Sequence, residues 1–236
     1  MVERGLAESP AKAQALVMAG VVFSSEQKLT SAGAKVAADL PVTVRTAEHP
    51  WVSRGGMKLA HGLKHFGFDA GGRIAVDLGS STGGFTDVLL TNGAAKVYAV
   101  DVGYGQLAHK LRTDPRVIVL ERTNARALDG ALIPDALNAV VCDASFIGLR
   151  TILPASMALT SAGAWLIALI KPQFEVGKER VPEGGVVRDP ALHAEVCETI
   201  SAWMNAQSGW TVNGVTQSPI TGAEGNVEFL IGVVRG

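Results

Sequence analysis

The sequence is poor in cysteine and in charged residues, and both shortages exclude classes of protein. Its two cysteines, Cys142 and Cys197, match neither a zinc-ligand spacing nor a CxxC motif, so we expect no disulfide framework and a reducing, cytoplasmic setting. The five histidines also lack a metal-ligand spacing, and we assign no metal site. The formal net charge is only −1, so any nucleic-acid contact must rest on local basic patches rather than on the charge of the whole chain.

The sequence also lacks an unbroken membrane-spanning run. Residues 1–10 carry charges and no apolar segment, so we expect no secretory signal. Residues 151–170 are uncharged, but Pro154 and the break at residues 161–163 divide them. We therefore predict a helix followed by a buried strand in this region, and no membrane partner.

What the sequence does contain is an apolar chain of 236 residues, 47% of them hydrophobic. That length suits one large α/β domain with a small appendage. Ser9, Pro10 and Gly20 bracket a short predicted helix, and residues 28–46 have the pattern of turns and strands. We therefore expect a small module over residues 1–47 and a main domain over residues 48–236.

The main domain alternates apolar strands with segments that can form helices. A predicted helix at residues 55–67 precedes predicted strands at residues 74–79, 96–103, 117–121, 137–143 and 164–171. This alternation is typical of a parallel sheet with both faces covered. Strands at residues 210–216 and 227–234 are joined by a connection too short for a parallel crossover, so we predict an antiparallel hairpin.

A glycine-rich turn, DLGSSTGGFTD at residues 77–87, lies between a buried strand and a helix. It is not GxGxxG, and Phe85 stands where a phosphate-binding loop needs lysine, which disfavours dinucleotides and nucleoside triphosphates. Asp77 and Asp87 flank the turn and suit a cationic ligand, and S-adenosylmethionine, with its sulfonium and ammonium groups, is one. Asp101, at the end of the next strand, is placed to hold a ribose diol. The alternative is a structural turn with capping aspartates.

Three charged residues mark strand ends: Asp143 and Lys171 each follow an apolar run, and Glu228 stands at the start of the last strand. If that last strand is antiparallel, all three lie on the edge where open α/β sheets bind ligands. Any one of them alone would be an ordinary solvated strand end. Together, beside the glycine turn, they indicate an active site.

Several segments stand out in a fixed order along nearly the whole chain: VERGLAES, KAQALVMAGVV, WVSRGGMKL, DLGSSTGGFTD, VYAVDVGYGQL, DPRVIVLERTNAR, CDASFI, IKPQFE, GGVVRDP and SPITGAEGNVEFL. In these segments the sequence resembles the TlyA family, which joins an S4-type RNA-binding module to a methyltransferase domain related to FtsJ. The resemblance implies a Rossmann-like α/β fold with a mostly parallel seven-stranded sheet, behind a small α+β module. It implies S-adenosylmethionine-dependent methylation of a ribose 2′-hydroxyl, that of a cytidine, in ribosomal RNA. Two alternatives stay open: a membrane-acting hemolysin, a name that some members carry, and an inactive RNA-binding protein.

The resemblance also implies a Lys-Asp-Lys-Glu tetrad, which falls on Lys58, Asp143, Lys171 and Glu228. Lys58 rests on the resemblance alone, because a lysine on an amphipathic helix is usually just solvated. We expect Lys171 to be the general base, with Asp143 and Glu228 orienting the two lysines. The residues expected to bind the cofactor are Asp77, Gly79, Ser80, Ser81, Thr82, Gly83, Gly84, Phe85, Asp101, Asn124 and Asp143.

Contacts with ribosomal RNA or a ribosomal subunit are expected from the first module and from the glycine-rich, charged loop at residues 172–190, since long loops are often functional. A solvated surface loop is the alternative. The first module lacks the strand and helix that precede VERGL in a whole S4 fold, so we expect a truncated module that binds RNA weakly. The expected RNA-binding residues are Arg4, Lys12, Arg54, Lys178, Arg180 and Arg188.

Overall fold

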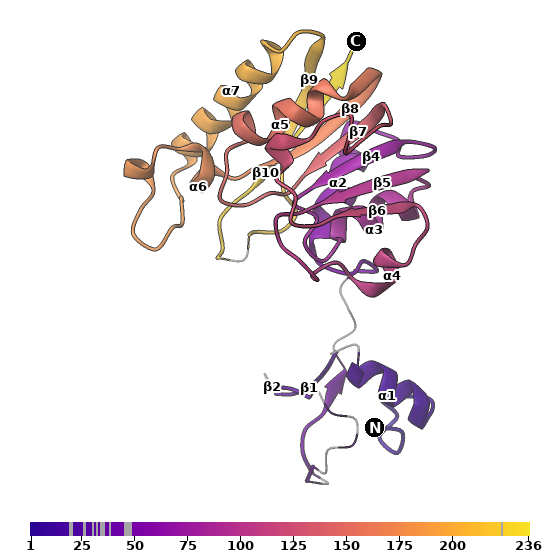
Figure 1. Ribbon diagram of the computed structural model, residues 1–236. Helices are drawn as coiled ribbons and strands as arrows, with labels where there is room; N and C mark the ends of the chain where they lie inside the picture. Colours follow the sequence, from indigo (N-terminus) through magenta and orange to yellow (C-terminus); the bar gives the residue numbers. More distant parts are fainter. Residues whose placement is uncertain are drawn as a thin grey trace. The chain divides into compact units, whose positions relative to one another are not determined.

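The structure, a computed structural model, describes residues 1–18, 21–25, 27–29, 31, 33, 36–37, 39–44, 49–222 and 224–236. The chain divides into two compact units, Met1–Pro50 and Trp51–Gly236 (Figure 1). The boundary expected near residue 48 falls within residues 45–48, outside the described residues. The assignment of the smaller unit as an S4-like module therefore stays a prediction.

The smaller unit contains a short helix and a small sheet. Helix α1 (Pro10–Met18) follows Ser9, whose hydroxyl accepts the Lys12 N–H at 3.2 Å. A serine cap before a proline at the first helical position starts a helix well. Strand β1 (Val22–Ser24) pairs antiparallel with β2 (Gln27–Lys28) and with β3 (Thr43–Val44).

The larger unit is built on a seven-stranded sheet with the order β6-β5-β4-β7-β8-β10-β9. The parallel strands are β4 (Ile74–Leu78), β5 (Lys96–Val100), β6 (Val117–Leu120), β7 (Leu137–Cys142) and β8 (Thr160–Ile170). Strand β10 (Phe229–Arg235) lies between β8 and β9 (Trp210–Gln217) and is antiparallel to both. The mostly parallel sheet and the antiparallel hairpin confirm the predicted fold class.

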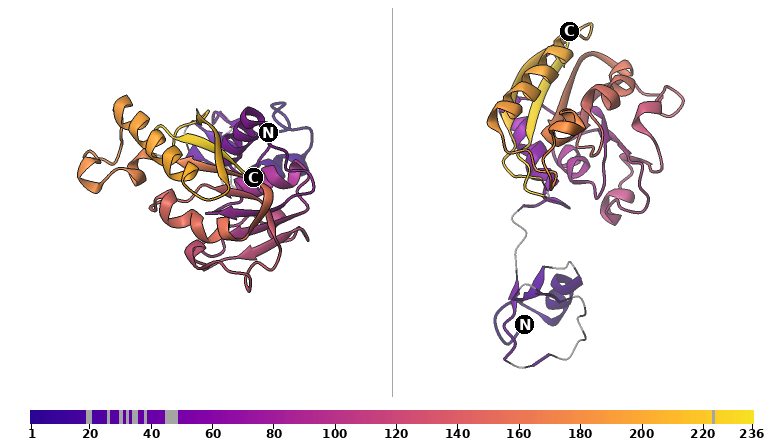
Figure 2. Two further views of the ribbon diagram at one scale, coloured as in Figure 1. Left: turned by 90° about the horizontal axis from the view of Figure 1, so that it is seen from above. Right: turned by 90° about the vertical axis from the view of Figure 1, so that its left-hand side faces the viewer.

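Helices cover both faces of this sheet (Figure 2). On one face pack α2 (Gly55–Phe66), α3 (Gly84–Thr91) and α4 (His109–Arg112); on the other pack α5 (Leu149–Ala158), α7 (Pro190–Asn205) and the 3-10 helix η1 (Ala125–Ala127). Helix α6 (Pro172–Glu175) and η2 (Lys178–Arg180) precede α7.

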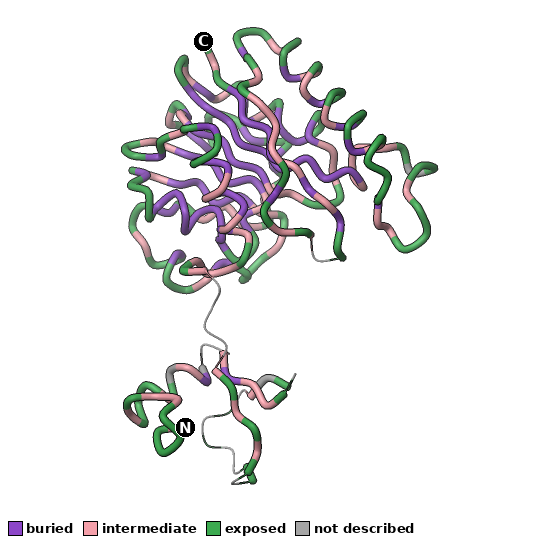
Figure 3. Tube along the Cα trace, turned by 180° about the vertical axis from the view of Figure 1, so that it is seen from behind, coloured by how far each residue is buried: buried purple, intermediate pink, exposed green. Residues whose placement is uncertain are grey.

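Alternate residues of each strand enter two separate cores. In β4, Ala75 belongs to the core that contains residues of α2 and α3, whereas Val76 belongs to the core that contains residues of α5 and α7, and both are fully buried. The strands form the buried centre of the unit (Figure 3). Because a parallel sheet is covered on both faces, its strands are apolar throughout, which is why these runs were recognisable in the sequence.

The uncharged segment at residues 151–170 divides as predicted. Its first part belongs to α5, which contains Pro154, and its second part is β8. Among the helices of the described residues, none combines the length and apolar character needed to cross a membrane.

Candidate active site

The carboxyl ends of β7 and β8 and the start of β10 place three charged side chains together. Asp143 directly follows β7 and Lys171 directly follows β8. Glu228 directly precedes β10, in which Phe229 pairs with Ile170 of β8. The antiparallel direction of β10 thus brings its first residues to the edge where the parallel strands end.

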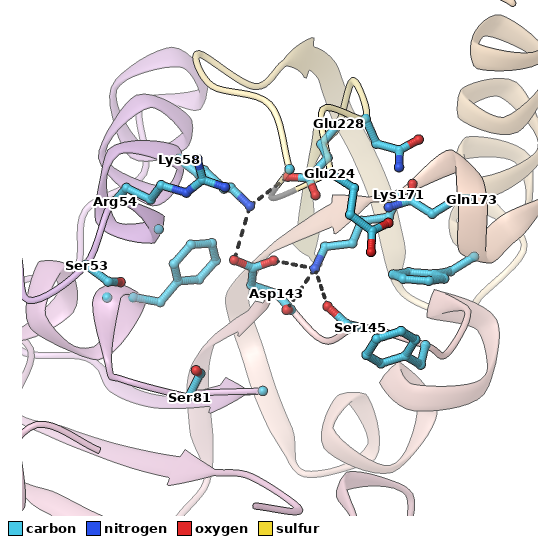
Figure 4. Close-up of a pocket in the computed structure, with 18 of the residues that line it drawn as sticks. Ser53, Arg54, Lys58, Ser81, Asp143, Ser145, Lys171, Gln173, Glu224 and Glu228 are labelled. Atoms are coloured by element: carbon cyan, nitrogen blue, oxygen red, sulfur yellow. Dashed lines mark hydrogen bonds and ion pairs between the residues drawn. The ribbon is translucent and has the colours of Figure 1, made fainter. Parts of the chain in front are cut away.

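A chain of ion pairs joins these three residues to Lys58 of α2 (Figure 4). Lys171 Nζ lies 2.7 Å from Asp143 Oδ1, and Lys58 Nζ lies 3.4 Å from Asp143 Oδ2. Lys58 Nζ also lies 2.6 Å from Glu228 Oε2. Asp143 therefore bridges the two lysines, and Glu228 forms a second ion pair with Lys58.

The tetrad is buried and its formal charges cancel. The side chains of Lys58, Lys171 and Glu228 are 8%, 7% and 3% exposed, and that of Asp143 is 20% exposed. Buried charges are tolerated when each is paired and hydrogen-bonded. Lys171 meets this condition fully, because its Nζ also donates to the Asp143 carbonyl oxygen at 3.1 Å and to Ser145 Oγ at 3.0 Å.

The tetrad lines a pocket of about 600 Å³. A second cavity of about 360 Å³ shares Gly79, Ser81 and Asp143 with it, so the two adjoin. The second cavity is lined by Asp101 and Asn124. Volumes of this size are those of small-molecule sites.

The glycine turn forms one wall of the larger pocket. Gly79 has a φ of +79°, and a Cβ there would lie 2.9 Å from the Cα of Ala144, so the position requires glycine. Ser81 also adopts a left-handed φ of +47°. Of the residues predicted for the cofactor in this turn, those lining the pocket are Asp77, Gly79, Ser80, Ser81, Thr82, Gly84 and Phe85.

Gly83 lines neither cavity. Its φ is +96°, and a Cβ there would lie 2.2 Å from Leu111 Cδ1. Glycine at this position therefore allows α3 to start and α4 to pack closely against the turn. The sequence could not separate this packing role from ligand contact.

Asp77 is fully buried at the base of the pocket. Its Oδ2 accepts hydrogen bonds from the Thr86 N–H at 3.0 Å and the Thr86 hydroxyl at 2.7 Å. Its Oδ1 has no hydrogen-bond partner among the described residues. Burial raises the pKa of Asp77 to about 7, with a further contribution from the charge of Asp143.

Asp87 does not take the role that the sequence suggested for it. Its Oδ2 accepts the Val52 N–H at 2.8 Å and pairs with Lys110 Nζ at 2.9 Å, and it lines neither cavity. Asp87 is one turn into α3 and faces the start of the unit rather than the pocket. The interpretation of both flanking aspartates as ligands of a cation was therefore wrong for Asp87.

Asp101 and Asn124 lie in the second cavity, and both carry local hydrogen bonds. Asp101 accepts the Ser81 N–H at 2.8 Å and the Gly103 N–H at 2.7 Å. Asn124 caps η1 by accepting the Arg126 N–H at 3.1 Å. Both side chains thus have fixed positions beside the glycine turn.

The residues predicted to bind RNA belong to both units. Arg54 is exposed and lines the pocket, and Arg188 is exposed in the loop before α7. Arg180 is paired with Glu195 of α7, with one nitrogen–oxygen distance of 2.7 Å. The Lys178 side chain lies outside the described part of the chain. In the smaller unit Lys12 is exposed, and Arg4 Nη1 donates to the Leu40 carbonyl oxygen at 2.5 Å.

Among the pocket residues that sequence reasoning missed are Ser145, Phe146, Gln173 and Phe174. Phe146 is 89% exposed, has a left-handed φ of +66°, and its ring centroid lies 5.2 Å from that of Phe174. An exposed phenyl ring on a strained backbone is costly and is typical of functional sites. The available signal was the position of these residues directly after Asp143 and Lys171.

Comparison with known proteins places this site in a family. A family model described as FtsJ-like methyltransferase matches residues 51–235. The chain belongs to the FtsJ-like methyltransferase family. The matched residues include the ion-paired tetrad and the glycine turn of this FtsJ-like methyltransferase.

Similar proteins extend the likeness over almost the whole chain and confirm the resemblance seen in the sequence. The 16S/23S rRNA (cytidine-2'-O)-methyltransferase TlyA of Mycobacterium tuberculosis (strain ATCC 25618 / H37Rv) is 48% identical over 233 residues, covering 98% of this chain and 86% of the relative. Hemolysin A of Brachyspira hyodysenteriae is 38% identical over 227 residues, covering 96% and 94%. A solved structure described as a hemolysin of Streptococcus thermophilus has 38% identity and a TM-score of 0.78, covering 98% of this chain and 85% of that one.

Proposed function

We propose that this FtsJ-like methyltransferase transfers a methyl group from S-adenosylmethionine to a ribose 2′-hydroxyl of ribosomal RNA. The observation that carries the proposal is the buried Lys58–Asp143–Lys171–Glu228 chain beside a glycine turn with a buried, half-paired carboxylate. A weak nucleophile such as a ribose hydroxyl needs a positioned proton acceptor and a methyl donor held in line with it. The two adjoining cavities offer room for both reactants.

The residues around the turn fit a cationic cofactor. Asp77 Oδ1 is buried without a partner among the described residues, and an ammonium group would supply the missing donor. Asp101 and Asn124 would hold the ribose and adenine parts in the second cavity. When bound, S-adenosylmethionine supplies an activated methyl group on its sulfonium.

The lysines have different surroundings, and these support different roles. In its neutral form Lys171 would accept the hydroxyl proton and become an ammonium, which the Asp143 carboxylate, the Asp143 carbonyl oxygen and Ser145 are placed to stabilise. Lys58 is held by two carboxylates and would orient the ribose as a donor. Asp143 touches both lysines and would keep them at a fixed separation.

The RNA substrate is supported by the names of the relatives and by the exposed aromatic side chain beside the tetrad. The relative from Mycobacterium tuberculosis is named for the ribose of cytidine in 16S and 23S rRNA, and we extend that substrate to this chain. Phe146 lines both cavities. It would stack on the base of the target nucleotide once that base has left its helix.

The smaller unit would act as an S4-like module and increase the affinity for RNA. Its contacting cations would be Arg4 and Lys12. In the larger unit, Arg54 at the pocket and Arg188 in the loop before α7 would contact phosphates. Lys178 and Arg180 belong to the same proposal, although Arg180 would have to leave Glu195 to reach RNA. A ribosomal substrate would place the enzyme in the cytoplasm.

We predict that Phe146→Ala weakens use of the RNA substrate more than it weakens cofactor binding, although the side chain lines both cavities. Loss of one base-stacking contact should lower kcat/KM for RNA by about 10- to 100-fold. Leu132→Ala, which truncates another exposed hydrophobic side chain, is the control and should retain activity. Steady-state kinetics with calorimetric cofactor binding measure both effects. Equal kcat/KM values for the two variants would contradict the stacking role.

The direct test of the proposed function is transfer of tritiated methyl groups from S-adenosylmethionine to small and large ribosomal subunits and to naked rRNA. Label in RNA, mapped to a 2′-O-methyl nucleotide by nuclease resistance, is the expected result. Absence of label with all substrates, despite cofactor binding, would reject RNA methylation. A vesicle-leakage assay on the same preparation tests the hemolysin alternative. Leakage without methyl transfer would favour a membrane-acting hemolysin over the proposed methyltransferase.

A further inference from the structure

Two loops that are far apart in the sequence form part of the pocket wall. The loop between α6 and α7 contributes Val181 and Gly185. The loop before β10 contributes Gly222 and Asn226, and ends at Glu228. None of these residues belongs to the glycine turn that would hold the cofactor.

Asn226 clamps the first loop with a buried carboxamide. It is 1% exposed; its Oδ1 accepts the Val187 N–H at 3.0 Å, and its Nδ2 donates to the Gly185 carbonyl oxygen at 3.0 Å. His193 of α7 holds the same stretch from the other side, since its Nε2 lies 2.8 Å from the Val187 carbonyl oxygen. Because buried polar groups that lose their partners are costly, this clamp fixes the backbone of residues 185–187.

The same residue is linked to the tetrad through its own loop. The Asn226 carbonyl oxygen accepts the Gly222 N–H at 2.9 Å and closes a tight turn. A Cβ at Gly222 would lie 2.7 Å from Glu228 Oε1, so this turn packs directly on the carboxyl group that holds Lys58. A shift of the turn would therefore shift Glu228.

We propose that Asn226 is a positioning residue for methyl transfer, which couples the pocket-facing loop at residues 181–187 to Glu228 and, through it, to Lys58. The inference rests on the proposed function. This coupling gives the loop at residues 181–187 a definite role, because a contact between the loop and RNA would be transmitted through Asn226 to Glu228. Since the described contacts of Asn226 do not include the glycine turn, its loss affects the rate and leaves cofactor affinity unchanged.

Asn226→Asp tests the coupling, because aspartate keeps the shape and the acceptor for the Val187 N–H but replaces the donor to Gly185 with an oxygen. Asn138→Asp is the matched control. Asn138 also uses both ends of its carboxamide, since it accepts the Ile74 N–H at 2.9 Å and donates to Ser161 Oγ at 3.2 Å. It lies at the amino end of β7, whereas the tetrad residue Asp143 follows the carboxyl end of that strand. We expect kcat to fall about 10- to 100-fold in N226D, as for a small misplacement of reacting groups. The control should keep kcat, and cofactor Kd should change less than about twofold in both.

Hydrogen exchange of the free proteins gives a readout independent of catalysis. In N226D, exchange should accelerate together in peptides covering residues 181–189 and 218–230, with residues 77–87 unchanged. Asn226→Ser, which replaces the carboxamide with a smaller neutral hydroxyl, should retain more of kcat and of the protection than N226D, and it carries the test if N226D does not fold.

Three results decide the matter. If N226D and N138D have the same kcat, Asn226 does not position the tetrad. If exchange accelerates in residues 181–189 alone, Asn226 only holds that loop, and the proposed coupling to Glu228 is wrong. If the wild type transfers no methyl group to RNA, the proposed function fails, whereas joint acceleration of both peptides would still establish the coupling.

Discussion

Replacing Lys171 with alanine is expected to lower the rate of methyl transfer by about a thousandfold while cofactor binding survives, because the main proton acceptor is lost. The described contacts of Lys171 are with Asp143 and Ser145, and none is with the glycine turn that would hold the cofactor. Single-turnover methylation with excess enzyme measures the chemical step, and calorimetry measures cofactor Kd.

Lys171→Arg separates proton transfer from charge pairing. Arginine keeps the positive charge beside Asp143 but stays protonated, so it should be nearly as inactive as alanine. Lys96→Ala, which breaks a lysine–aspartate pair with a 2.6 Å distance at the start of β5, controls for the loss of an ion pair and should retain activity. An active arginine variant would show that Lys171 only orients the substrate.

Cofactor affinity should rise with pH between about 6 and 7.5, and Asp77→Asn should remove this dependence. The pKa of Asp77 is raised by burial to about 7, so the unliganded protein carries a proton there at lower pH. Only the ionised carboxylate pairs with an ammonium group, and affinity should therefore increase up to about tenfold as that proton is lost. Titration calorimetry across this range measures the effect, and an equal slope in D77N would contradict it.

The contribution of Asp77 to the stability of the free protein should change with pH in the opposite direction to cofactor affinity. Between the ordinary pKa of 3.8 and the folded value of about 7, the native protein holds a proton that the unfolded chain has released. The contribution of Asp77 to the free energy of unfolding is therefore full at low pH and declines as pH rises through about 7. In the absence of cofactor, Tm of D77N relative to wild type should rise from pH 5 to pH 8. A constant difference would mean that Asp77 is ionised throughout.

The elements of the larger unit could be predicted because a sheet covered on both faces requires continuous apolar strands. The same rule located Asp143 and Lys171, since the first polar residue after such a run marks the functional edge. Glu228 followed from the short connection before the last strand, which required an antiparallel direction. Lys58 did not follow from any pattern, because only the packing of α2 turns it toward Asp143 and Glu228.

The errors and omissions have a common cause. Asp77 and Asp87 look equivalent in the sequence, but Asp77 lies near the end of β4 at the base of the pocket, and Asp87 turns toward Val52 and Lys110. Which side of a short helix faces a ligand depends on tertiary packing. Phe146 and Asn226 lie in loops without periodicity, so only the folded chain shows that one is exposed at the pocket and the other is buried as a clamp.

The position of β10 has a consequence for the order in which the molecule is made. This strand is synthesised after β9, yet it lies between β8 and β9 and carries Glu228 at its start. During translation, residues 228–235 must leave the ribosome before the sheet can close. A nascent chain can therefore assemble the glycine turn and the Lys171–Asp143 pair early, but its tetrad stays incomplete until this last strand inserts. Methyl transfer to ribosomal RNA would thus become possible only after residues 228–235 have joined the sheet.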